Sequence, residues 1–297
     1  MTKLDFIEKY FFEKAKFMMP AFQRQSKRFG NKWKEDFLYV LDNFFENNNH
    51  LEDAINAYNH FCFDGMRLQK RFEKTLKYEK NSYEESKKNV YLNKDYMFNV
   101  YLPGILLTHF LWPHHYENFL FFREKVISRV PDDKINFCDI GPGTGFYTRL
   151  ILENKKKAQG HVFDISDHSI KFTKSHCKKF NVLDRLVCNK LNIINSSIEK
   201  KYDFLINVEV LEHMEDPIVF LKALQKMMKN NSYGFITAAV NAALEDHIYL
   251  YRSGNEVKEQ IENCGFTVIE QQYDIAYEPK KNEPVPESVA FLVQKKP

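Results

Sequence analysis

A cluster of glycines after residue 140 is the feature that most restricts how this chain can fold. Gly141, Gly143 and Gly145 lie in the stretch FCDIGPGTGFYT, although the whole 297-residue chain contains only 10 glycines. The apolar run INFCDI before them predicts a buried strand, and FYTRLILEN after them predicts a helix. A strand-to-helix turn uses glycine where backbone angles are closed to other residues and where a ligand approaches the main chain. We therefore predict a ligand-binding turn at these glycines.

Seven strand-like runs follow residue 130 and alternate with polar segments of helix length. The runs are INFCDI, GHVFDI, RLVCNKL, DFLINV, GFITAAV, FTVIEQQYDIAY and VAFLVQKK. This alternation predicts an α/β fold with a mostly parallel sheet flanked by helices, because parallel neighbours need long crossover connections. The last two runs are joined by EPKKNEPVPES, which is too short for a crossover helix. We therefore expect a seven-stranded, mostly parallel sheet with an antiparallel C-terminal hairpin strand.

Residues 1–112 are predicted to be all helical. Apolar residues recur at helical spacing in segments such as LDFIEKYFFEK and WKEDFLYVLDNF. The segments AFQRQSKRFGNK and FENNNH are rich in residues that favour turns, so we expect them to separate helices. Pro113 disfavours helical geometry at Trp112, which makes this pair the predicted junction. We expect two units, a helical N-terminal region at 1–112 and an α/β domain at 113–297.

Charge and cysteine content narrow the functional classes. The 43 basic and 40 acidic residues give a net charge of +3 without a long single-sign block, so no nucleic-acid partner is expected. No apolar run reaches membrane-spanning length, and the start MTKLDFIEKYFFEK carries charges where a signal peptide needs an apolar stretch. We therefore expect a cytoplasmic protein without a membrane partner. The five cysteines are scattered without a C-x-x-C pair, which predicts free thiols.

The spacing of the glycines distinguishes two classes of nucleotide ligand. A dinucleotide-binding fingerprint, G-x-G-x-x-G, would place its third glycine at position 146, where this chain has Phe146. The observed pattern runs from Asp139 as D-x-G-x-G-x-G, and it resembles motif I of the class I methyltransferases that use S-adenosylmethionine (SAM). The resemblance implies that Gly141, Gly143 and Gly145 wrap the amino acid portion of SAM and that Asp139 helps to hold it.

Later parts of the chain continue this resemblance in the right order, over roughly residues 115–297. Asp164 ends the second apolar run, where the family places the acid that accepts the ribose hydroxyls. Asn192 follows the third run, where many relatives carry an Asp that contacts adenine. The fourth run leads into EVLEHMEDP, which looks like the small-molecule branch that includes the quinone methyltransferases. Glu209, the first residue of this segment, is assigned to the cofactor site as well.

The segment EVLEH also offers groups for chemistry. Glu209, Glu212 and His213 are spaced i, i+3 and i+4, so in a helical turn they would share one face. The pattern is similar to one that coordinates a divalent cation in some family members, with a later histidine such as His247 as a further ligand. The alternative is a site without metal, and we favour it. In that site Glu212 and His213 are catalytic and His247 contacts substrate.

Aromatic residues are concentrated in the N-terminal region, since 17 of the 27 phenylalanines lie in the first 122 residues. They predict the core of a helical bundle. The resemblance implies that such helices fold over the cofactor cleft and form the acceptor pocket. Tyr101, His109, His114 and His115 are the polar groups there that could orient an acceptor. The same helices could instead form a dimerisation surface.

Three functions remain open at this point. The leading hypothesis is SAM-dependent methyl transfer to an O, N or C centre of a small molecule. In the second, a SAM-consuming lyase or cyclase uses the cofactor's own aminobutyrate chain and needs no other substrate. The third is a catalytically silent SAM-binding or assembly protein, because fold and chemistry are separable.

Overall fold

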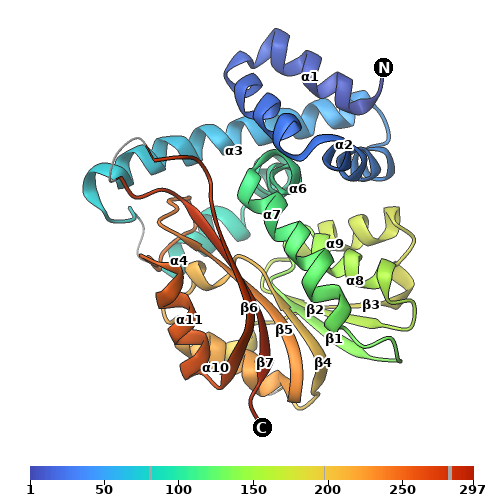
Figure 1. Ribbon diagram of the computed structural model, residues 1–297, viewed down its shortest axis with the longest axis vertical. Coiled ribbons are helices and arrows are strands. Elements are labelled where there is room, and N and C mark those ends of the chain that lie inside the picture. The colour runs from blue at the N-terminus through green and yellow to red at the C-terminus, as the bar shows by residue number, and fades with distance from the viewer. Residues whose placement is uncertain (80–81, 197, 280–282) are drawn as a thin grey trace.

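The fold is built around one mixed sheet. The computed structural model describes residues 1–297 except 80–81, 197 and 280–282, and Figure 1 shows the sheet below a group of helices. Among these residues the sheet has seven strands, in the order β3-β2-β1-β4-β5-β7-β6. They are β1 Asn136–Ile140, β2 Gln159–Asp164, β3 Leu186–Lys190, β4 Tyr202–Asn207, β5 Met228–Val240, β6 Phe266–Ile275 and β7 Glu287–Lys295. Each overlaps one of the seven predicted runs, so the predicted fold class is confirmed.

Strand β7 supplies the antiparallel element. β1 pairs in parallel with β2 and β4, whereas β7 lies antiparallel between β5 and β6. The predicted C-terminal hairpin of β6 and β7 is therefore confirmed. β7 is paired along both edges, and its side chains alternate between the two hydrophobic cores, so residues Val289–Val293 have no exposed surface.

Helices cover both faces of the sheet and create two hydrophobic cores. Neighbouring residues of β5 point to opposite sides, so Phe235 packs in one core and Ile236 in the other. The first core contains residues of α7 Pro113–Phe121, α8 Phe146–Asn154 and α9 Asp167–Lys179. The second contains residues of α10 Pro217–Met227 and α11 Gly254–Asn263. Asp216 caps α10 by accepting hydrogen bonds from the first-turn amides, and Pro217 opens the helix.

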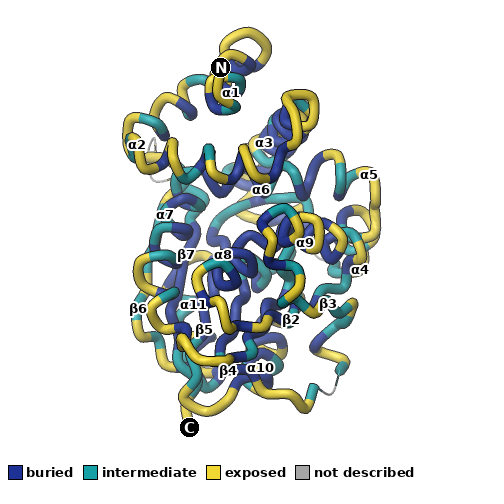
Figure 2. The backbone as a smooth tube through the Cα atoms, turned by 90° about the vertical axis from the view of Figure 1, so that its right-hand side faces the viewer, coloured by how far each residue is buried: buried dark blue, intermediate teal, exposed yellow. Residues whose placement is uncertain are grey.

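The N-terminal helices form a layer at one end of the sheet. They are α1 Lys3–Lys14, α2 Met19–Phe44, α3 Asn48–Thr75 and α6 Leu102–Leu111. Figure 2 shows their outer surfaces exposed and their inner surfaces buried. Their core is continuous with the first core of the sheet, and the indole Nε1 of Trp33 donates a 2.7 Å hydrogen bond to the carbonyl oxygen of Phe110. The predicted helical character of this region is confirmed, whereas the division into units at 112/113 stays a prediction.

The predicted break inside α2 is present. AFQRQSKRFGNK is expected to separate two helices, and α2 joins two helical stretches across a kink at Gly30, where φ is 63°. Glycine supplies the backbone angles that this kink needs. Phe22 and Trp33, on either side of Gly30 in the sequence, are buried and pack edge to face. FENNNH separates α2 from α3, which begins at Asn48.

A chain of short helices joins α3 to α6. It consists of α4 Tyr83–Ser86, a π-helical turn at Lys87–Tyr91, α5 Lys94–Tyr96 and a second π-helical turn at Met97–Tyr101. We call residues 83–101 the connecting segment. The remaining short helices are Lys16–Met18, Phe122–Val126, Ile127–Arg129, Leu183–Arg185, Ile193–Asn195 and Leu211–His213.

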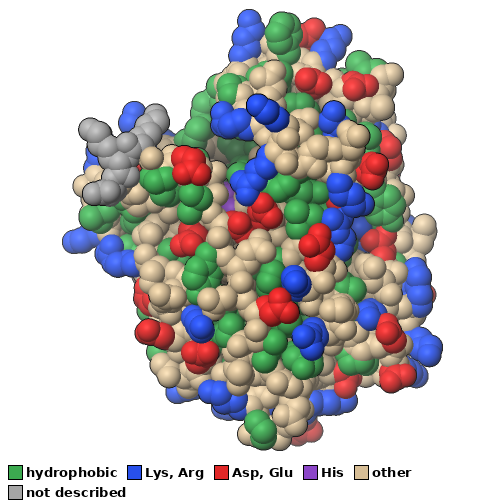
Figure 3. All heavy atoms as spheres, viewed as in Figure 1, with side chains coloured by type: hydrophobic (Ala, Val, Ile, Leu, Met, Phe, Trp, Pro, Cys, Tyr) green, Lys and Arg blue, Asp and Glu red, His purple; other side chains and the backbone are tan. Residues whose placement is uncertain are grey.

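The surface carries charges of both signs. On the face shown in Figure 3, Lys and Arg side chains are interspersed with Asp and Glu, so this face has no single-sign field. Within the described ranges, none of the helices combines the length and the apolar character needed to cross a membrane.

Candidate functional site

A cavity lies where the first four strands end. It measures about 730 Å³ including its mouth, and it is lined by residues that end or follow β1, β2, β3 and β4. In open α/β sheets ligands bind outside the carboxyl ends of the strands, so the position is the expected one. The connecting segment covers the cavity from the other side with the rings of Tyr83, Tyr91 and Tyr101.

The glycine turn forms one wall of the cavity, as predicted. Gly141, Gly143 and Gly145 all have positive φ, and the first two line the cavity. A Cβ atom at Gly143 would meet nothing within 4 Å, whereas one at Gly145 would lie 2.7 Å from Thr173 of α9. Gly143 therefore leaves space for a ligand, and Gly145 lets α8 and α9 pack closely.

Asp139 lies behind this wall rather than on it. It is the fourth residue of β1, it is almost fully buried, and its carboxylate accepts a hydrogen bond from the hydroxyl of Thr148 in α8. Burial raises the pKa of Asp139 to about 7, although the Thr148 hydrogen bond opposes this. Asp139 is not among the residues that line the cavity. Its contact with a cofactor stays a prediction, and its observed role is to tie β1 to α8.

Asp164 faces the cavity at the end of β2. One carboxylate oxygen accepts a 2.8 Å hydrogen bond from the main-chain amide of Ser166. Burial raises the pKa of Asp164 to about 6. Asn192 lies across the cavity after β3, and its side-chain oxygen already accepts a hydrogen bond from the amide of Ile194. Both predicted positions thus border the same space, and Asn192 also shapes its own turn.

The predicted helical turn at EVLEH is wrong. Glu209 has a φ of 52°, and only Leu211–His213 form a short 3-10 helix, so the three polar residues do not share one helical face. The Glu209 carboxylate accepts hydrogen bonds of 2.7 and 2.8 Å from the hydroxyls of Thr237 in β5 and Ser288 in β7. Glu209 therefore bridges two strands at the edge of the cavity.

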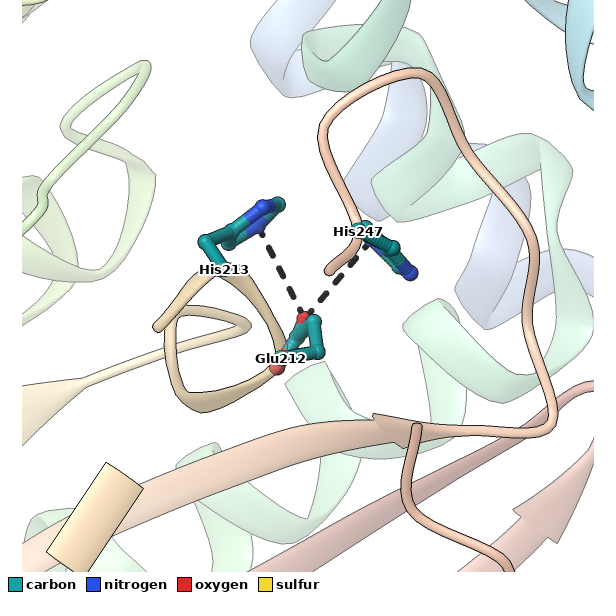
Figure 4. Close-up of side chains that lie close together, drawn as sticks. All are labelled: Glu212, His213 and His247. Carbon is teal, nitrogen blue, oxygen red and sulfur yellow. Dashed lines mark ion pairs between the residues drawn. The ribbon is translucent and has the colours of Figure 1, made fainter. Parts of the chain in front are cut away.

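Glu212, His213 and His247 come together next to the cavity, with Glu212 between the two imidazoles (Figure 4). One Glu212 oxygen lies 3.8 Å from Nε2 of His213 and 4.0 Å from Nε2 of His247. Both Nδ1 atoms lie close to main-chain carbonyl oxygens, at 3.0 Å for His213 and 2.7 Å for His247. A carbonyl can only accept, so both Nδ1 atoms carry hydrogen and both Nε2 atoms offer a lone pair toward Glu212.

The Glu212 carboxylate is chemically unusual. It has no exposed surface, and neither oxygen has a hydrogen-bond partner among the described residues. Burial raises its pKa well above the usual value, and the carboxylates of Glu209 and Asp246 raise it further. Burial also lowers the pKa of His247 to about 4. A cation bound between the Glu212 carboxylate and the two imidazole lone pairs would give this buried group the partner that it lacks. One carboxylate and two imidazoles suit several divalent metals.

Two polar residues of this centre, Asp246 and Tyr91, were not predicted from the sequence. Asp246 precedes His247, and its carboxylate lies 3.4 Å from Nδ1 of His213. The same oxygen accepts hydrogen bonds from the phenols of Tyr101, at 2.6 Å, and Tyr91, at 3.1 Å. Burial opposes ionisation of Asp246, yet His213, His247 and the two phenols hold its pKa below the usual value. Only Tyr101 of this group was predicted as a site residue besides the two histidines.

The three histidines predicted as site residues in the N-terminal region do not line the cavity. His109 is buried and stacks on Phe146, with ring centroids 4.1 Å apart. His114 is buried against Trp112, and Nδ1 of His115 lies 2.9 Å from the hydroxyl of Thr108. Burial lowers the pKa of all three. Their assignment to an acceptor stays a prediction.

Comparison with known proteins adds independent information. A family model described as a methyltransferase domain matches residues 114–271. The chain is 29% identical over 123 residues to the ubiquinone biosynthesis O-methyltransferase of Pelagibacter ubique. This match covers 41% of this chain and 49% of the relative. It is 28% identical over 129 residues to the mitochondrial ubiquinone biosynthesis O-methyltransferase of Dictyostelium discoideum, in a match that covers 39% of this chain and 40% of that relative. The chain thus spans about half the length of the first of these relatives and less than half of the second.

Solved structures share the fold. The [4+2]-cyclase SpnF superposes with a TM-score of 0.50 at 11% identity, over 61% of this chain and 80% of the cyclase. A putative sarcosine dimethylglycine methyltransferase from Galdieria sulphuraria gives the same TM-score and identity, over 61% and 86%. At this identity the likeness extends to the fold alone.

Proposed function

Because this chain belongs to the methyltransferase-domain family, whose cofactor is SAM, we propose that it transfers the methyl group of SAM to a small-molecule acceptor. The observation that carries the proposal is the cavity beside the glycine turn. There the open space at Gly143, the carboxylate of Asp164 and the imidazole of His213 border one volume. This arrangement supports a cofactor site with a proton acceptor beside it.

The residues present fit SAM. The main chain at Gly141 and Gly143 lets a ligand approach closely, and Asp164 offers the oxygens that two ribose hydroxyls need. When bound, SAM supplies a methyl group already activated by its positive sulfur. The protein therefore mainly has to align the acceptor and exclude water. The rings of Tyr83, Tyr91 and Tyr101 close the cavity and suit this task.

His213 is the residue we propose to accept the proton of the acceptor group. It borders the cavity, and its Nδ1–H is held by the carbonyl of Asp246, which leaves a lone pair on Nε2. The names of the curated relatives include O-methyltransferase and ubiquinone biosynthesis, so hydroxylated precursors of quinones are the first acceptors to test. An acidic hydroxyl would lose its proton to a neutral imidazole most readily.

The partnerless carboxylate of Glu212 favours a second candidate for the same centre. In this version Glu212, His213 and His247 hold a divalent cation, which supplies charge to make the acceptor anionic. Glu209 is outside this set because Thr237 and Ser288 occupy its carboxylate. Elemental analysis and exhaustive chelation separate the two versions, since full activity after chelation excludes the cation.

We further propose that the N-terminal region closes over the cleft. All three tyrosines among the described residues that line the cavity come from the connecting segment, which supports this assignment. The alternative, a homodimer through the N-terminal helices, draws on exposed apolar side chains such as Phe12, Phe17 and Phe63. Light scattering of the wild type and of Phe17→Ser/Phe63→Ser tests it, because a dimer held by these rings would dissociate.

Calorimetry and product analysis test the function. We expect heat of binding with SAM and with S-adenosylhomocysteine, and none with a nicotinamide dinucleotide. Incubation with SAM and a panel of hydroxylated aromatic compounds should yield S-adenosylhomocysteine and a methylated product. Formation of methylthioadenosine without an acceptor would instead identify the lyase or cyclase. Binding without turnover of any kind would identify a silent SAM-binding protein.

A further inference from the structure

The carboxylate of Asp246 joins two parts of the molecule that are far apart in the sequence. Tyr91 and Tyr101 belong to the connecting segment, and both phenols donate to the same oxygen of Asp246. Asp246 lies in the loop between β5 and α11 and is almost completely buried. Two donors on one buried oxygen fix its position more tightly than either would alone.

Asp246 also places two acceptors next to one ring nitrogen of His213. Nδ1 of His213 lies 3.0 Å from the main-chain oxygen of Asp246 and 3.4 Å from its carboxylate. Both groups are acceptors, so together they favour hydrogen on Nδ1. The lone pair is then on Nε2, which faces Glu212.

The connecting segment is also tied to the cofactor side of the cavity. The hydroxyl of Ser166 donates a 2.7 Å hydrogen bond to the carbonyl of Tyr91, and the amide of Ser166 donates to Asp164. Tyr91 therefore contacts Asp246 through its side chain and the end of β2 through its main chain. The segment thus contacts both the turn that holds Asp164 and the carboxylate that lies next to His213.

We propose that Asp246 is a positioning residue for His213, and that docking of the connecting segment through Tyr91 and Tyr101 sets the reactive orientation of that imidazole. The inference rests on the proposed function, because it assigns a use to the Nε2 lone pair. Whether that lone pair takes a proton or binds a cation, it is available only when hydrogen is on Nδ1. Closing the N-terminal region over the cleft thus completes the site chemically as well as sterically.

The test measures the tautomer of His213 directly, in metal-free protein labelled with ¹⁵N at histidine. Long-range ¹H–¹⁵N correlation spectra at one mildly alkaline pH distinguish hydrogen on Nδ1 from hydrogen on Nε2, and a His213→Gln variant identifies the signals. We expect the Nδ1–H form in the wild type. The main-chain carbonyl of residue 246 remains in Asp246→Ala and in the double variant Tyr91→Phe/Tyr101→Phe, but it is no longer held in place by the contacts of the carboxylate with the phenols. We therefore expect a shift toward a mixture of the two forms in both variants.

The controls separate positioning from general stability. Tyr116→Phe also removes a buried phenol that donates to a carboxylate, that of Asp36, but it lies in α7 away from this centre. It should leave the His213 signals unchanged. The tyrosine pair loses only two oxygen atoms, so it keeps the test decisive if Asp246→Ala does not fold. Unchanged His213 signals in a folded tyrosine pair, or hydrogen on Nε2 in the wild type, would overturn the inference.

Hydrogen exchange tests the docking step in the same proteins. Amides of residues 83–101 should exchange faster in the tyrosine pair, while those of α1 keep their wild-type rates. Unchanged exchange of residues 83–101 would show that the two phenols do not hold the segment. SAM calorimetry on the wild type is independent of these readings. Absence of SAM binding would remove the proposed function, whereas the spectra judge the role of Asp246.

Discussion

His109 stacks on Phe146 with the two rings nearly parallel, at 14° and with centroids 4.1 Å apart. Phe146 occupies the position at which a dinucleotide-binding turn would need its third glycine. Here the large side chain fills the contact between α6 and the start of α8, where Phe110 of α6 also packs against it. The residue that argues against a dinucleotide thus also attaches the N-terminal helices to the cofactor-binding turn.

Replacing Phe146 with Ala should destabilise the whole protein. The side chain is 1% exposed, and truncating a buried Phe typically costs about 3–5 kcal/mol in free energy of unfolding. Urea denaturation measures the change. Phe12→Ala is the matched control, since this ring is 64% exposed and its loss should cost less than about 0.5 kcal/mol. Equal losses in the two variants would contradict the packing described for α6 and α8.

Sequence periodicity and spacing predicted much of the fold and of the cofactor site. Short apolar runs predicted the strands, and the positions of the glycines and of Asp164 follow from where strands end. These features are local, because a strand end and a tight turn are specified by neighbouring residues. Asp139 shows the limit of the argument, since its place in the sequence does not reveal that its side chain points away from the cavity toward Thr148.

The rest of the site depends on contacts between distant segments. Tyr101 and Asp246 are separated by 145 positions, and neither belongs to a local motif that would pair them. Asp246 lies in an irregular loop, where periodicity gives no information about side-chain direction. The spacing of Glu209 fits a helical turn, but its backbone is left-handed and its carboxylate accepts hydrogen bonds from two strands instead. Tertiary contacts decided these positions.

The glycines of the turn should differ in what they control. Both Gly143 and Gly145 have positive φ, so alanine at either position costs about 1–2 kcal/mol in backbone strain. Gly145→Ala also forces a methyl group against Thr173, so its melting temperature should fall further than that of Gly143→Ala. Gly143→Ala should mainly weaken SAM binding, because its methyl group enters open space. Thermal melting and SAM calorimetry measure the two effects, and the reverse order would refute the assignment.

The affinity for SAM should fall at acidic pH. Burial raises the pKa of Asp164 to about 6, so below this pH the free protein carries a protonated acid that accepts ribose hydroxyls poorly. Linkage then predicts up to about tenfold weaker binding per pH unit below that point. Asp164→Asn should bind SAM roughly 10–100-fold more weakly and lose the pH dependence. Asp139→Asn should retain the dependence, and a slope that disappears with Asp139 instead would reassign it.

Asp139 should make folding stability depend on pH. Its pKa in the folded protein is about 7, above the value of 3.8 for an ordinary Asp, so between these values the folded state binds more protons than the unfolded state. Stability from this group is therefore present at low pH and is lost as the pH rises through that window. Each pKa unit corresponds to about 1.4 kcal/mol. In urea titrations Asp139→Asn, which keeps an acceptor for Thr148, should reduce this slope.

The two glutamates of EVLEH should differ in metal binding. If Glu212, His213 and His247 hold a cation, Glu212→Gln removes its only carboxylate ligand, and affinity for Co²⁺ should fall by more than the 10–100-fold typical of outer-shell changes. Glu209→Gln should retain the Co²⁺ absorption spectrum, because Thr237 and Ser288 already use that carboxylate. Absorption titrations with both variants measure the difference. Equal losses would place Glu209 in the ligand set, and a wild type that binds no Co²⁺ would leave His213 to act as a base without metal.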